Sequence, residues 1–358
     1  FDLGYNPRSL EDEEYFRSNN IGIKKQFGKH HSVFFGDKIL IWGKADRLNP
    51  LDVWNAEDFE YFITRNKALR KIARTMLVYE YQKTNKKLQF VAALNDSRSY
   101  HDFPRENNVW CNRHCRQFST ANVQRSAQSL SQEAEFNSFS TEGMDIGFRF
   151  SHKWEKIDYS IMAYHGADRF PYYEKNIGSG VVEFTPYQEA QTQVGFDLSR
   201  VVGKYNVIFE NKYQFSRPYF KTPTTANLIL DDNGLIFSDE YTWILGIDRT
   251  LSPDLFANIQ FYQRYIVDNN EDLYDFGGTD FLTFLLRYSY SESLRFEYLN
   301  LYELNTSDLS EKFSVLYTYS DKLNFEASAQ FFGSENNDSF FAGLNESDTY
   351  TFDMHIIF

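Results

Sequence analysis

The feature that most restricts the fold of this chain is the alternation of apolar and polar residues in fifteen separate segments. In "MDIGFRFS" every second residue is apolar, namely Met144, Ile146, Phe148 and Phe150. Side chains of a β-strand point alternately to opposite faces, so this period of two predicts strands with one apolar face. Most segments have about ten residues, the length that a tilted strand needs to cross a bilayer. The segments are 17–27, 31–43, 72–83, 87–96, 144–151, 156–166, 190–200, 204–215, 238–249, 255–266, 281–290, 293–303, 311–320, 323–332 and 347–358.

The connections between these segments alternate between short and long along the chain, as tight turns on one rim and long loops on the other rim require. The sequence therefore predicts an all-β fold in one domain, 1–358: a transmembrane, antiparallel, up-and-down β-barrel of about sixteen strands (about 14–18). Short periplasmic turns, long extracellular loops and a bacterial outer-membrane location follow from this fold. An even strand number requires one more strand, which we expect upstream of residue 1. The short turns are 27–30, 83–87, 152–156, 200–204, 250–254, 291–293 and 320–322, and the long loops are 44–71, 97–142, 167–189, 216–237, 267–279, 304–310 and 334–346.

Composition agrees with strands that are apolar on one face and wet on the other. Aromatic residues make up 18% of the 358 residues, yet charged residues make up 24% and the mean hydropathy is −0.54. No apolar run approaches the roughly 18 residues of a membrane-spanning helix. The net charge of −13 argues against a nucleic-acid partner, because phosphate binding needs a basic surface. Outer-membrane lipid is the partner that the apolar face predicts.

Charged residues in the strands fall at the positions between the apolar ones, so we expect them to line the lumen. An Arg or Lys on the lipid face at mid-bilayer would cost about 2–4 kcal/mol. Two interpretations stay open for each residue: it lines a water-filled channel, or it pairs across the wall and stiffens it. The expected lumen residues are Glu80, Asp145, Arg149, Asp158, Asp197, Glu210, Lys212, Asp248, Gln260, Arg264, Arg287, Arg295, Glu297, Lys312, Glu326 and Asp353. Aromatic residues near strand ends, which we expect to form interfacial girdles, are Trp154, Tyr205, Tyr288, Tyr290 and Tyr319.

The loop 44–71 differs in composition from the rest of the chain. Asn49-Pro50 predicts a turn, and Asn55 is a candidate N-cap for a short helix over 56–64. One interpretation is that the loop folds into the pore and forms a constriction with a transverse field, as charged rings do in selective pores. The other is that Asp46, Asn49 and Asp52 hold a long loop in shape by bonding backbone amides. The residues of the hypothetical constriction are Asp46, Asp52, Glu57, Asp58, Arg65, Arg70 and Arg74.

The stretch "WGKADRLNPLDVWNAEDF" (42–59) resembles the W-G-x-x-D-x-x-N-P-x-D-x-x-N-P-x-D-F signature of a poorly characterised family of proteobacterial outer-membrane β-barrels. It departs from that pattern at Ala56, where a second proline is expected. Genes of this family often lie beside those of membrane pumps that export lipids or hydrophobic compounds, or in clusters for extracellular electron transfer. The resemblance therefore implies a porin-like barrel and leaves open a periplasmic or surface protein partner.

The final segment, "TYTFDMHIIF", ends on the aromatic residue Phe358. It resembles the assembly signal of bacterial outer-membrane proteins, in which the terminal Phe is recognised by the barrel-assembly machinery. This resemblance implies that the machinery is a partner during biogenesis.

The sequence contains two cysteines, Cys111 and Cys115, in "CNRHC". We expect a small disulfide in the loop 97–142, since outer-membrane proteins fold in an oxidising compartment. His114 between them leaves a zinc site open as an alternative, but a fourth ligand is not apparent, so we predict no metal and no cofactor. Nucleotide-binding, hydrolase, zinc-protease and c-type haem motifs are absent from the sequence.

The function that these features predict is a non-enzymatic channel that passes small solutes through a polar lumen narrowed by the loop 44–71. The first alternative is a barrel subunit of a multi-protein export or electron-transfer complex. The second is an outer-membrane hydrolase with catalytic groups on the rim, which would need a pair such as His–Ser within hydrogen-bond reach.

Overall fold

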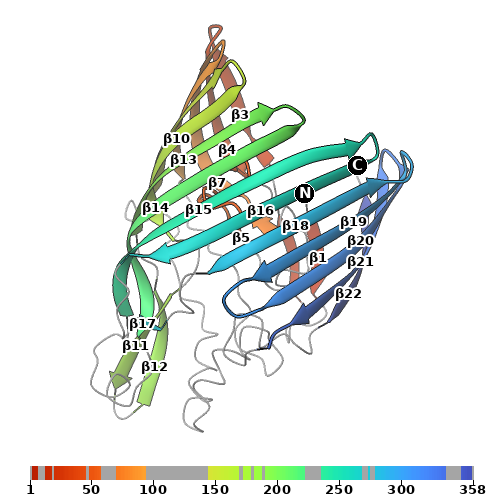
Figure 1. The fold of residues 1–358 in the computed structure, drawn as a ribbon. Helices are drawn as coiled ribbons and strands as arrows, with labels where there is room; N and C mark the ends of the chain where they lie inside the picture. The colour runs from red at the N-terminus through yellow and green to blue at the C-terminus, as the bar shows by residue number, and fades with distance from the viewer. Residues whose placement is uncertain are drawn as a thin grey trace.

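Antiparallel β-strands make up almost all of the regular structure in the computed structural model (Figure 1). The structure describes residues 2–6, 13–17, 20–45, 48–57, 70–93, 144–168, 172–178, 181–187, 190–221, 235–267, 273–274, 279–335 and 348–356. Within this part of the chain no helix is long and apolar enough to cross a membrane.

One large sheet contains fifteen strands that pair with their neighbours in chain order. Each of them corresponds to one of the fifteen predicted segments, so the strand prediction is confirmed. The strands are β3 (Asn20–Phe27), β4 (His31–Lys38), β7 (Arg74–Lys83), β8 (Lys86–Ala93), β9 (Asp145–Trp154), β10 (Ile157–Ala167), β13 (Ala190–Val202), β14 (Tyr205–Lys221), β15 (Leu235–Ser252), β16 (Leu255–Ile266), β18 (Asp280–Ser289), β19 (Leu294–Glu303), β20 (Leu309–Ser320), β21 (Leu323–Gly333) and β22 (Thr349–Ile356).

The remaining described strands lie outside this path. β17 (Leu273–Tyr274) pairs with β14 and is the sixteenth strand of the sheet. Three two-stranded sheets are separate: β1 (Asp2–Asn6) with β2 (Glu13–Arg17), β5 (Ala56–Glu57) with β6 (Lys71–Ile72), and β11 (Tyr172–Gly178) with β12 (Val181–Tyr187).

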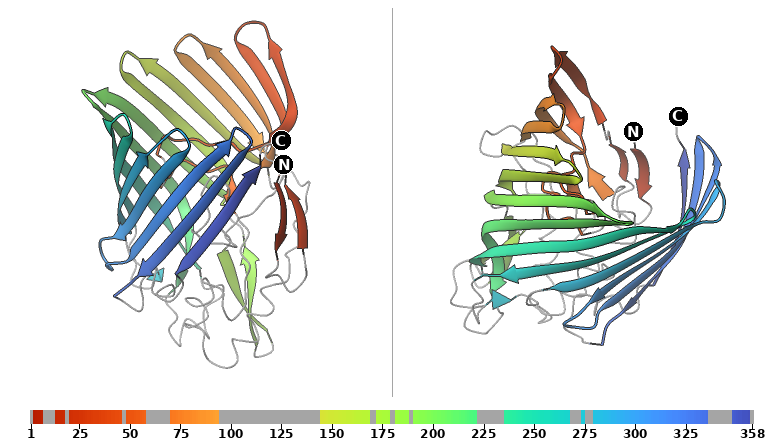
Figure 2. Two further views of the ribbon diagram at one scale, coloured as in Figure 1. Left: turned by 90° about the vertical axis from the view of Figure 1, so that its right-hand side faces the viewer. Right: turned by 45° about the horizontal axis from the view of Figure 1, so that its top comes forward.

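The sheet curves through most of a cylinder, with β3 and β22 as its two edges (Figure 2). These edges do not pair with each other among the described residues. Fifteen strands that alternate in direction leave the first and the last parallel, so a fully antiparallel cylinder needs one more strand between them. The additional strand that we expect upstream of residue 1 would bring the number of strands to an even value. It stays a prediction.

The connections sort by length as the sequence predicts. Short turns join β3 to β4, β7 to β8, β9 to β10, β13 to β14, β15 to β16, β18 to β19 and β20 to β21. In two of these turns a glycine adopts a positive φ, 63° at Gly28 and 62° at Gly203, a conformation that glycine reaches without strain. The connections at the other rim are longer and include β5, β6, β11, β12 and β17.

The outward face of the sheet is apolar and exposed, which is the surface that a barrel presents to lipid. Its exposed side chains include Leu77, Phe90, Ile146, Ile161, Val194, Leu245, Ile259, Phe296, Phe313 and Phe352. The five expected girdle residues are also exposed and lie beside the short turns, as interfacial aromatics do. The fold is that of an outer-membrane β-barrel, and the chain belongs in the bacterial outer membrane.

Candidate functional site: an inward loop and a charged band on the lumen wall

The loop between β4 and β7 packs against the inner face of the sheet; its described residues are 39–45, 48–57 and 70–73. Its residues Leu40, Trp42, Leu51, Val53 and Trp54 are buried in one apolar cluster. The Trp54 ring stands edge-on to the Trp42 and Tyr164 rings, with centroids 5.1 Å apart in both pairs. The wall contributes the other side of the cluster, from the inward positions Met76 and Val78 on β7, Val91 and Ala93 on β8, and Met162 and Tyr164 on β10.

Two glycines in the wall make room for this loop. A Cβ atom at Gly147 of β9 would lie 2.5 Å from Cζ2 of Trp54 and 2.9 Å from Cη2 of Trp42. A Cβ atom at Gly195 of β13 would overlap Cδ2 of Leu51. A glycine inside a strand often marks a close approach of this kind, so the sequence contained the signal for both contacts.

The loop is held in shape by two asparagine side chains. Asn49 donates from Nδ2 to the carbonyl oxygen of Trp42 (2.8 Å), and its Oδ1 accepts from the amide of Leu51 (3.0 Å). Asn55 bonds both backbone groups of Leu40, accepting at 3.0 Å and donating at 2.8 Å. Gly43 has a φ of 90°, where a side chain would also strike Asn49. Asn49 therefore holds the loop in shape through hydrogen bonds to the backbone, as the second interpretation of the loop predicts.

The helix expected over 56–64 does not begin where we predicted it. Ala56 and Glu57 form β5, in which Ala56 pairs with Ile72 and Glu57 pairs with Lys71. Asn55 consequently caps no helix, because its side chain is already bonded to Leu40. Residues 58–64 lie outside the described part of the chain.

The charged residues expected at a constriction form local pairs where the structure describes them. Asp52 pairs with Lys71 and accepts from Nδ2 of Asn55 (2.9 Å). Glu57 lies 3.4 Å from Arg70. Of the remaining candidates, Asp46, Asp58 and Arg65 lie outside the described residues. Lys71 lies outside the spanning strands, and burial lowers the pKa of its ammonium group to about 8.

A lowered lysine pKa means that the cost of burying the charge is not fully offset by its partner. The Lys71–Asp52 pair therefore fixes the position of the loop more than it adds stability.

Arg74 is fully buried and does not face an aqueous lumen. Its Nη1 donates to Oδ2 of Asp145 at 2.6 Å and to the carbonyl oxygen of Trp54 at 3.3 Å. Asp145 also accepts from the hydroxyl of Tyr164 (2.8 Å) and from the amide of Ala167 (3.1 Å). This network ties the loop, β7, β9 and β10 together at one level of the wall.

A band of charged side chains crosses the wall next to the loop, and Lys44 of the loop is its first cation. The Nζ atom of Lys44 lies 2.8 Å from Asp197 and 3.4 Å from Asp158. The backbone amides of Lys44 and Ala45 both donate to Oε1 of Glu210, the latter at 2.7 Å. These contacts attach the loop to β10, β13 and β14.

Arg149 completes this first part of the band. It donates to Oδ2 of Asp197 (2.8 Å) and to Oγ of Ser160 (2.9 Å), and Ser160 donates to Asp197 in turn. Lys153 lies 3.7 Å from Asp158. With Lys44, Asp158 and Glu210, the first part therefore holds three cations and three carboxylates.

The second part of the band surrounds Glu240 on β15. This buried carboxylate is contacted by three cations: Arg217, Lys212 at 3.4 Å and Arg264 at 3.9 Å. It also accepts from the hydroxyls of Tyr219 (2.9 Å) and Thr242 (3.1 Å). Glu240 thus gathers side chains of β14, β15 and β16 on the inner face.

Asp168 adds a second carboxylate to this group. It lies 3.8 Å from Nε of Arg217 and accepts from Gln191 at 3.0 Å. The described side chains of the second part of the band therefore include three cations and two carboxylates.

The other expected lumen residues lie on the same face of the sheet. Glu80 pairs with Lys87 at 2.7 Å, Arg287 with Glu297 at 3.0 Å, and Lys312 with Glu326 at 3.9 Å. The remaining lumen residues are placed by the register of the strands, in which Asp248 stands opposite Asn206 and Asn258, Gln260 opposite Thr283, Arg295 opposite Ser289, and Asp353 opposite Glu326.

Sequence reasoning missed Lys44, Arg217 and Glu240. Glu240 falls at an inward position of a predicted strand, so its parity was a usable signal. Arg217 falls in a predicted loop, because β14 continues to Lys221 past an irregularity in register between Gln214 and Arg217. No local pattern marks Lys44 as a partner of Asp197, which is distant in the sequence. Cys111, Cys115 and Phe358 lie outside the described residues, and the described residues contain no group of His, Cys, Asp and Glu that could hold a metal ion.

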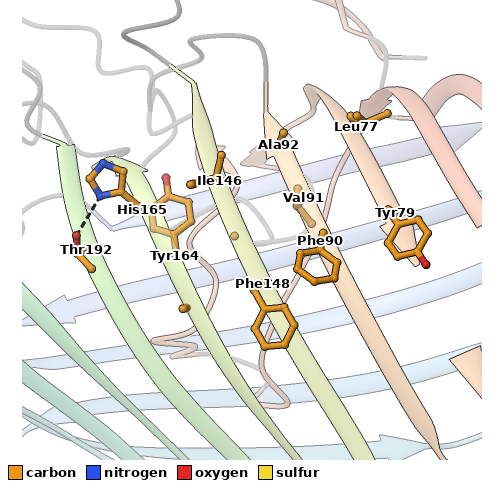
Figure 3. Close-up of a pocket in the computed structure, with 12 residues that line it drawn as sticks. Leu77, Tyr79, Phe90, Val91, Ala92, Ile146, Phe148, Tyr164, His165 and Thr192 are labelled. Atoms are coloured by element: carbon orange, nitrogen blue, oxygen red, sulfur yellow. Dashed lines mark hydrogen bonds between the residues drawn. The ribbon is translucent and has the colours of Figure 1, made fainter. Parts of the chain in front are cut away.

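A hollow of about 470 Å³ lies on the opposite, lipid-facing side of the same wall (Figure 3). Its lining includes the small side chains of Ala92 and Ala163 and the larger side chains of Leu77, Phe90 and Phe148. Its lining is apolar apart from groups such as His165, which bonds Thr192 at 3.0 Å. The part of the wall that contacts Trp42 and Trp54 is therefore apolar on both faces.

Neither a family model nor a curated protein matches this chain. Among solved structures, the chain is similar to OccAB1 of Acinetobacter baumannii, with 8% identity and a TM-score of 0.50 over 88% of this chain and 71% of that one. It also matches OmpTdeltaL8, a loop-deletion mutant of an outer membrane protein of Vibrio cholerae, with 8% identity and a TM-score of 0.45 over 94% and 88% of the two chains. The KdgM porin matches with 10% identity and a TM-score of 0.26 over 61% and 94%. The likeness to OccAB1 agrees with the fold described above.

Proposed function

We propose that the protein is a porin-like channel of the outer membrane that passes small polar solutes, and that the inward loop narrows its lumen. The observation that carries this proposal is the burial of the loop residues Trp42, Leu51 and Trp54 against the inner wall. A loop held on the lipid side or above the rim would not bury them there.

The size of the sheet supports a channel. Barrels of about sixteen strands enclose an aqueous lumen, whereas barrels of about eight are filled by their own side chains. The lumen face beyond the loop carries both signs of charge, as in the pairs Arg287–Glu297 and Lys312–Glu326. Such a surface stays wet, so a solute that passes the loop meets water along the rest of the wall.

In this proposal the loop narrows the lumen mainly by its volume. Asp52 and Glu57 are paired with Lys71 and Arg70, so these four charges largely cancel over short distances. Lys44 attaches the loop to Asp197 and Glu210, which keeps its position fixed while solutes pass.

Single-channel recording in planar bilayers tests the proposal. The purified protein should give discrete conductance steps, and the double substitution Trp42→Ala and Trp54→Ala should raise the step by roughly twofold, since it removes the anchor that holds the loop at the wall. Trp154→Ala is the matched control, because Trp154 is 60% exposed at the lipid interface and should leave the step unchanged. Absence of conductance steps from a correctly folded barrel would overturn the channel function.

The resemblance of residues 42–59 to a family linked with export and electron-transfer complexes supports a second candidate, a subunit of such a complex. The motif positions described here serve the loop itself: Trp42 is buried in the cluster, Asn49 bonds the backbone, and Asp52 pairs with Lys71. This makes the motif a packing device and favours the channel. Purification from native membranes tests the subunit role, which predicts a stoichiometric second protein.

A further inference from the structure

We propose that one half of the periplasmic rim, at the ends of β3, β7, β8 and β13, binds the headgroups of anionic phospholipids in the leaflet that meets the periplasm. The surface consists of four outward cations, which we call the basic arc: Lys25, Lys83, Lys86 and Arg200. The proposal rests on the barrel fold and is independent of what passes through the lumen.

The short turns differ in charge between the two halves of the rim, which is the first reason. The first four short turns contain eight Lys or Arg residues and one carboxylate, whereas the last three contain one Lys and three carboxylates. The former are 27–30, 83–87, 152–156 and 200–204, and the latter are 250–254, 291–293 and 320–322. Clusters of cations beside a membrane-spanning segment are typical of surfaces that bind anionic lipids.

The orientation of the basic arc is the second reason. Successive side chains alternate across a strand, so a cation an even number of positions from an exposed apolar residue lies on the same outer face. The four cations and their apolar reference residues are Lys25 with Ile23, Lys83 with Leu77, Lys86 with Phe90, and Arg200 with Val194. All four cations are exposed at or near strand ends, where long side chains reach the headgroup layer.

The third reason is that no carboxylate pairs with the basic arc within the described part of the chain. Lys87 and Lys153, which lie in the same turns but on the inner face, do pair, with Glu80 at 2.7 Å and with Asp158 at 3.7 Å. Lys25 contacts only an aromatic ring among these groups, with its Nζ 5.3 Å from the ring centroid of Phe27. A phosphate group in the headgroup layer can therefore supply the partner that these cations lack.

The second wall shows what the rim looks like without such a surface. Its outward positions beside the short turns carry the exposed rings of Tyr288, Tyr317 and Tyr319, which suit an interface whatever the charge of the headgroups. An acidic periplasmic protein would meet cations at the tips of the turns. The basic arc lies on the face that lipid covers, which favours a lipid headgroup as its occupant.

Two labelled positions compare the halves of the rim directly. In a background with Cys111→Ser and Cys115→Ser, a fluorophore is attached at Trp154→Cys, beside the basic arc, or at Tyr319→Cys on the second wall. The native residues at these positions are 60% and 66% exposed, so the two labels are matched. The full-length barrel is reconstituted in vesicles of phosphatidylcholine and phosphatidylglycerol in equal amounts, and one of the two lipids carries a nitroxide that quenches the fluorophore.

We expect nitroxide-labelled phosphatidylglycerol to quench about twofold more than nitroxide-labelled phosphatidylcholine at position 154, because the basic arc enriches the anionic lipid there. At position 319 the two lipids should quench equally. The difference at position 154 should disappear at about 1 M salt, where the Debye length falls to about 3 Å.

The triple substitution Lys83→Gln, Lys86→Gln and Arg200→Gln should bring the quenching ratio at position 154 to about one. The matched control is Lys87→Gln with Lys153→Gln and Lys322→Gln, which removes the same formal charge from the short turns but spares the basic arc. This control should keep the twofold ratio. Gel mobility before and after heating checks that each variant is folded.

Equal quenching by the two lipids at position 154, in a folded barrel that keeps its four cations, would overturn the proposal. It is also the result expected if the basic arc binds an acidic periplasmic protein instead. An unchanged ratio in the folded triple variant would overturn the proposal as well. None of these measurements uses conductance, so the failure of this proposal is distinguishable from the failure of the channel function.

Discussion

The wall formed by β7–β10 and the wall formed by β18–β22 share an apolar outer face but differ on the inside. Under the loop, the inward positions of the first wall carry Met76, Val78, Val91 and Met162. On the second wall, inward positions carry polar side chains, among them Thr283, Ser314, Ser328, Gln330 and Thr351. The inner face of this barrel is thus mostly polar on the second wall and apolar where it meets the loop.

This difference teaches how the loop position is encoded. Strands covered on both faces read as nearly continuous apolar runs, as in "TMLVYEY" of β7 and "FVAA" of β8, whereas strands with one wet face alternate. Glycines at Gly147 and Gly195 add close contacts where the loop crosses the wall. The position of the loop is therefore determined by residues of the strands as well as by residues of the loop.

The largest expected difference between the walls concerns their ion pairs. Asp145→Ala should lower the free energy of unfolding by about 3–5 kcal/mol, because it leaves the buried Arg74 charge uncompensated. Glu297→Ala on the second wall should cost less than about 1 kcal/mol, because its partner Arg287 is partly exposed. Urea unfolding of the reconstituted barrels, read by gel mobility, gives both values. Equal losses of unfolding free energy in the two variants would show that the ion pair under the loop is no better shielded from water than the pair on the second wall.

A smaller difference is expected for added volume. Gly147→Ala should destabilise the barrel by about 2 kcal/mol, since the new methyl group meets Trp54 and Trp42 and the backbone of a strand cannot yield freely. Gly246→Ala is the matched change on the inner face of β15, where the nearest atom would be Cγ of Gln260 at 3.4 Å. It should cost nothing measurable in the same assay. A harmless Gly147→Ala would mean that the loop does not rest on β9.

Most of the barrel could be predicted from the sequence because one physical rule covers every strand. Lipid selects apolar side chains on one face along the whole wall, so each of the fifteen strands carries its own signal. The same rule places Asp197, Glu210 and Arg264 on the inner face. It fails at Met76 and Met162, whose inward positions are apolar because a distant part of the chain covers them.

The site was harder to predict because its contacts join residues that are far apart. The pairing of Arg74 with Asp145, and not with the loop carboxylates, depends on the register of β7, β8 and β9. The helix expected over 56–64 was wrong at its start, because β6 pairs with Ala56 and Glu57, and helix propensity cannot anticipate such a partner. Lys44 joins Asp197 and Glu210 only after β10, β13 and β14 are assembled.

The central claim is that the loop lies against the inner wall at β13, and a disulfide measures this most directly. The test uses a background with Cys111→Ser and Cys115→Ser. In it, Leu51→Cys and Gly195→Cys would place two thiols within bonding reach, because a Cβ atom at Gly195 would overlap Cδ2 of Leu51. Mild oxidation in native membranes should crosslink them nearly completely, while Leu51→Cys with Ser314→Cys on β20 should stay reduced. We expect this crosslink to form and the conductance step to stay unchanged. Absence of the crosslink in a folded barrel would contradict it.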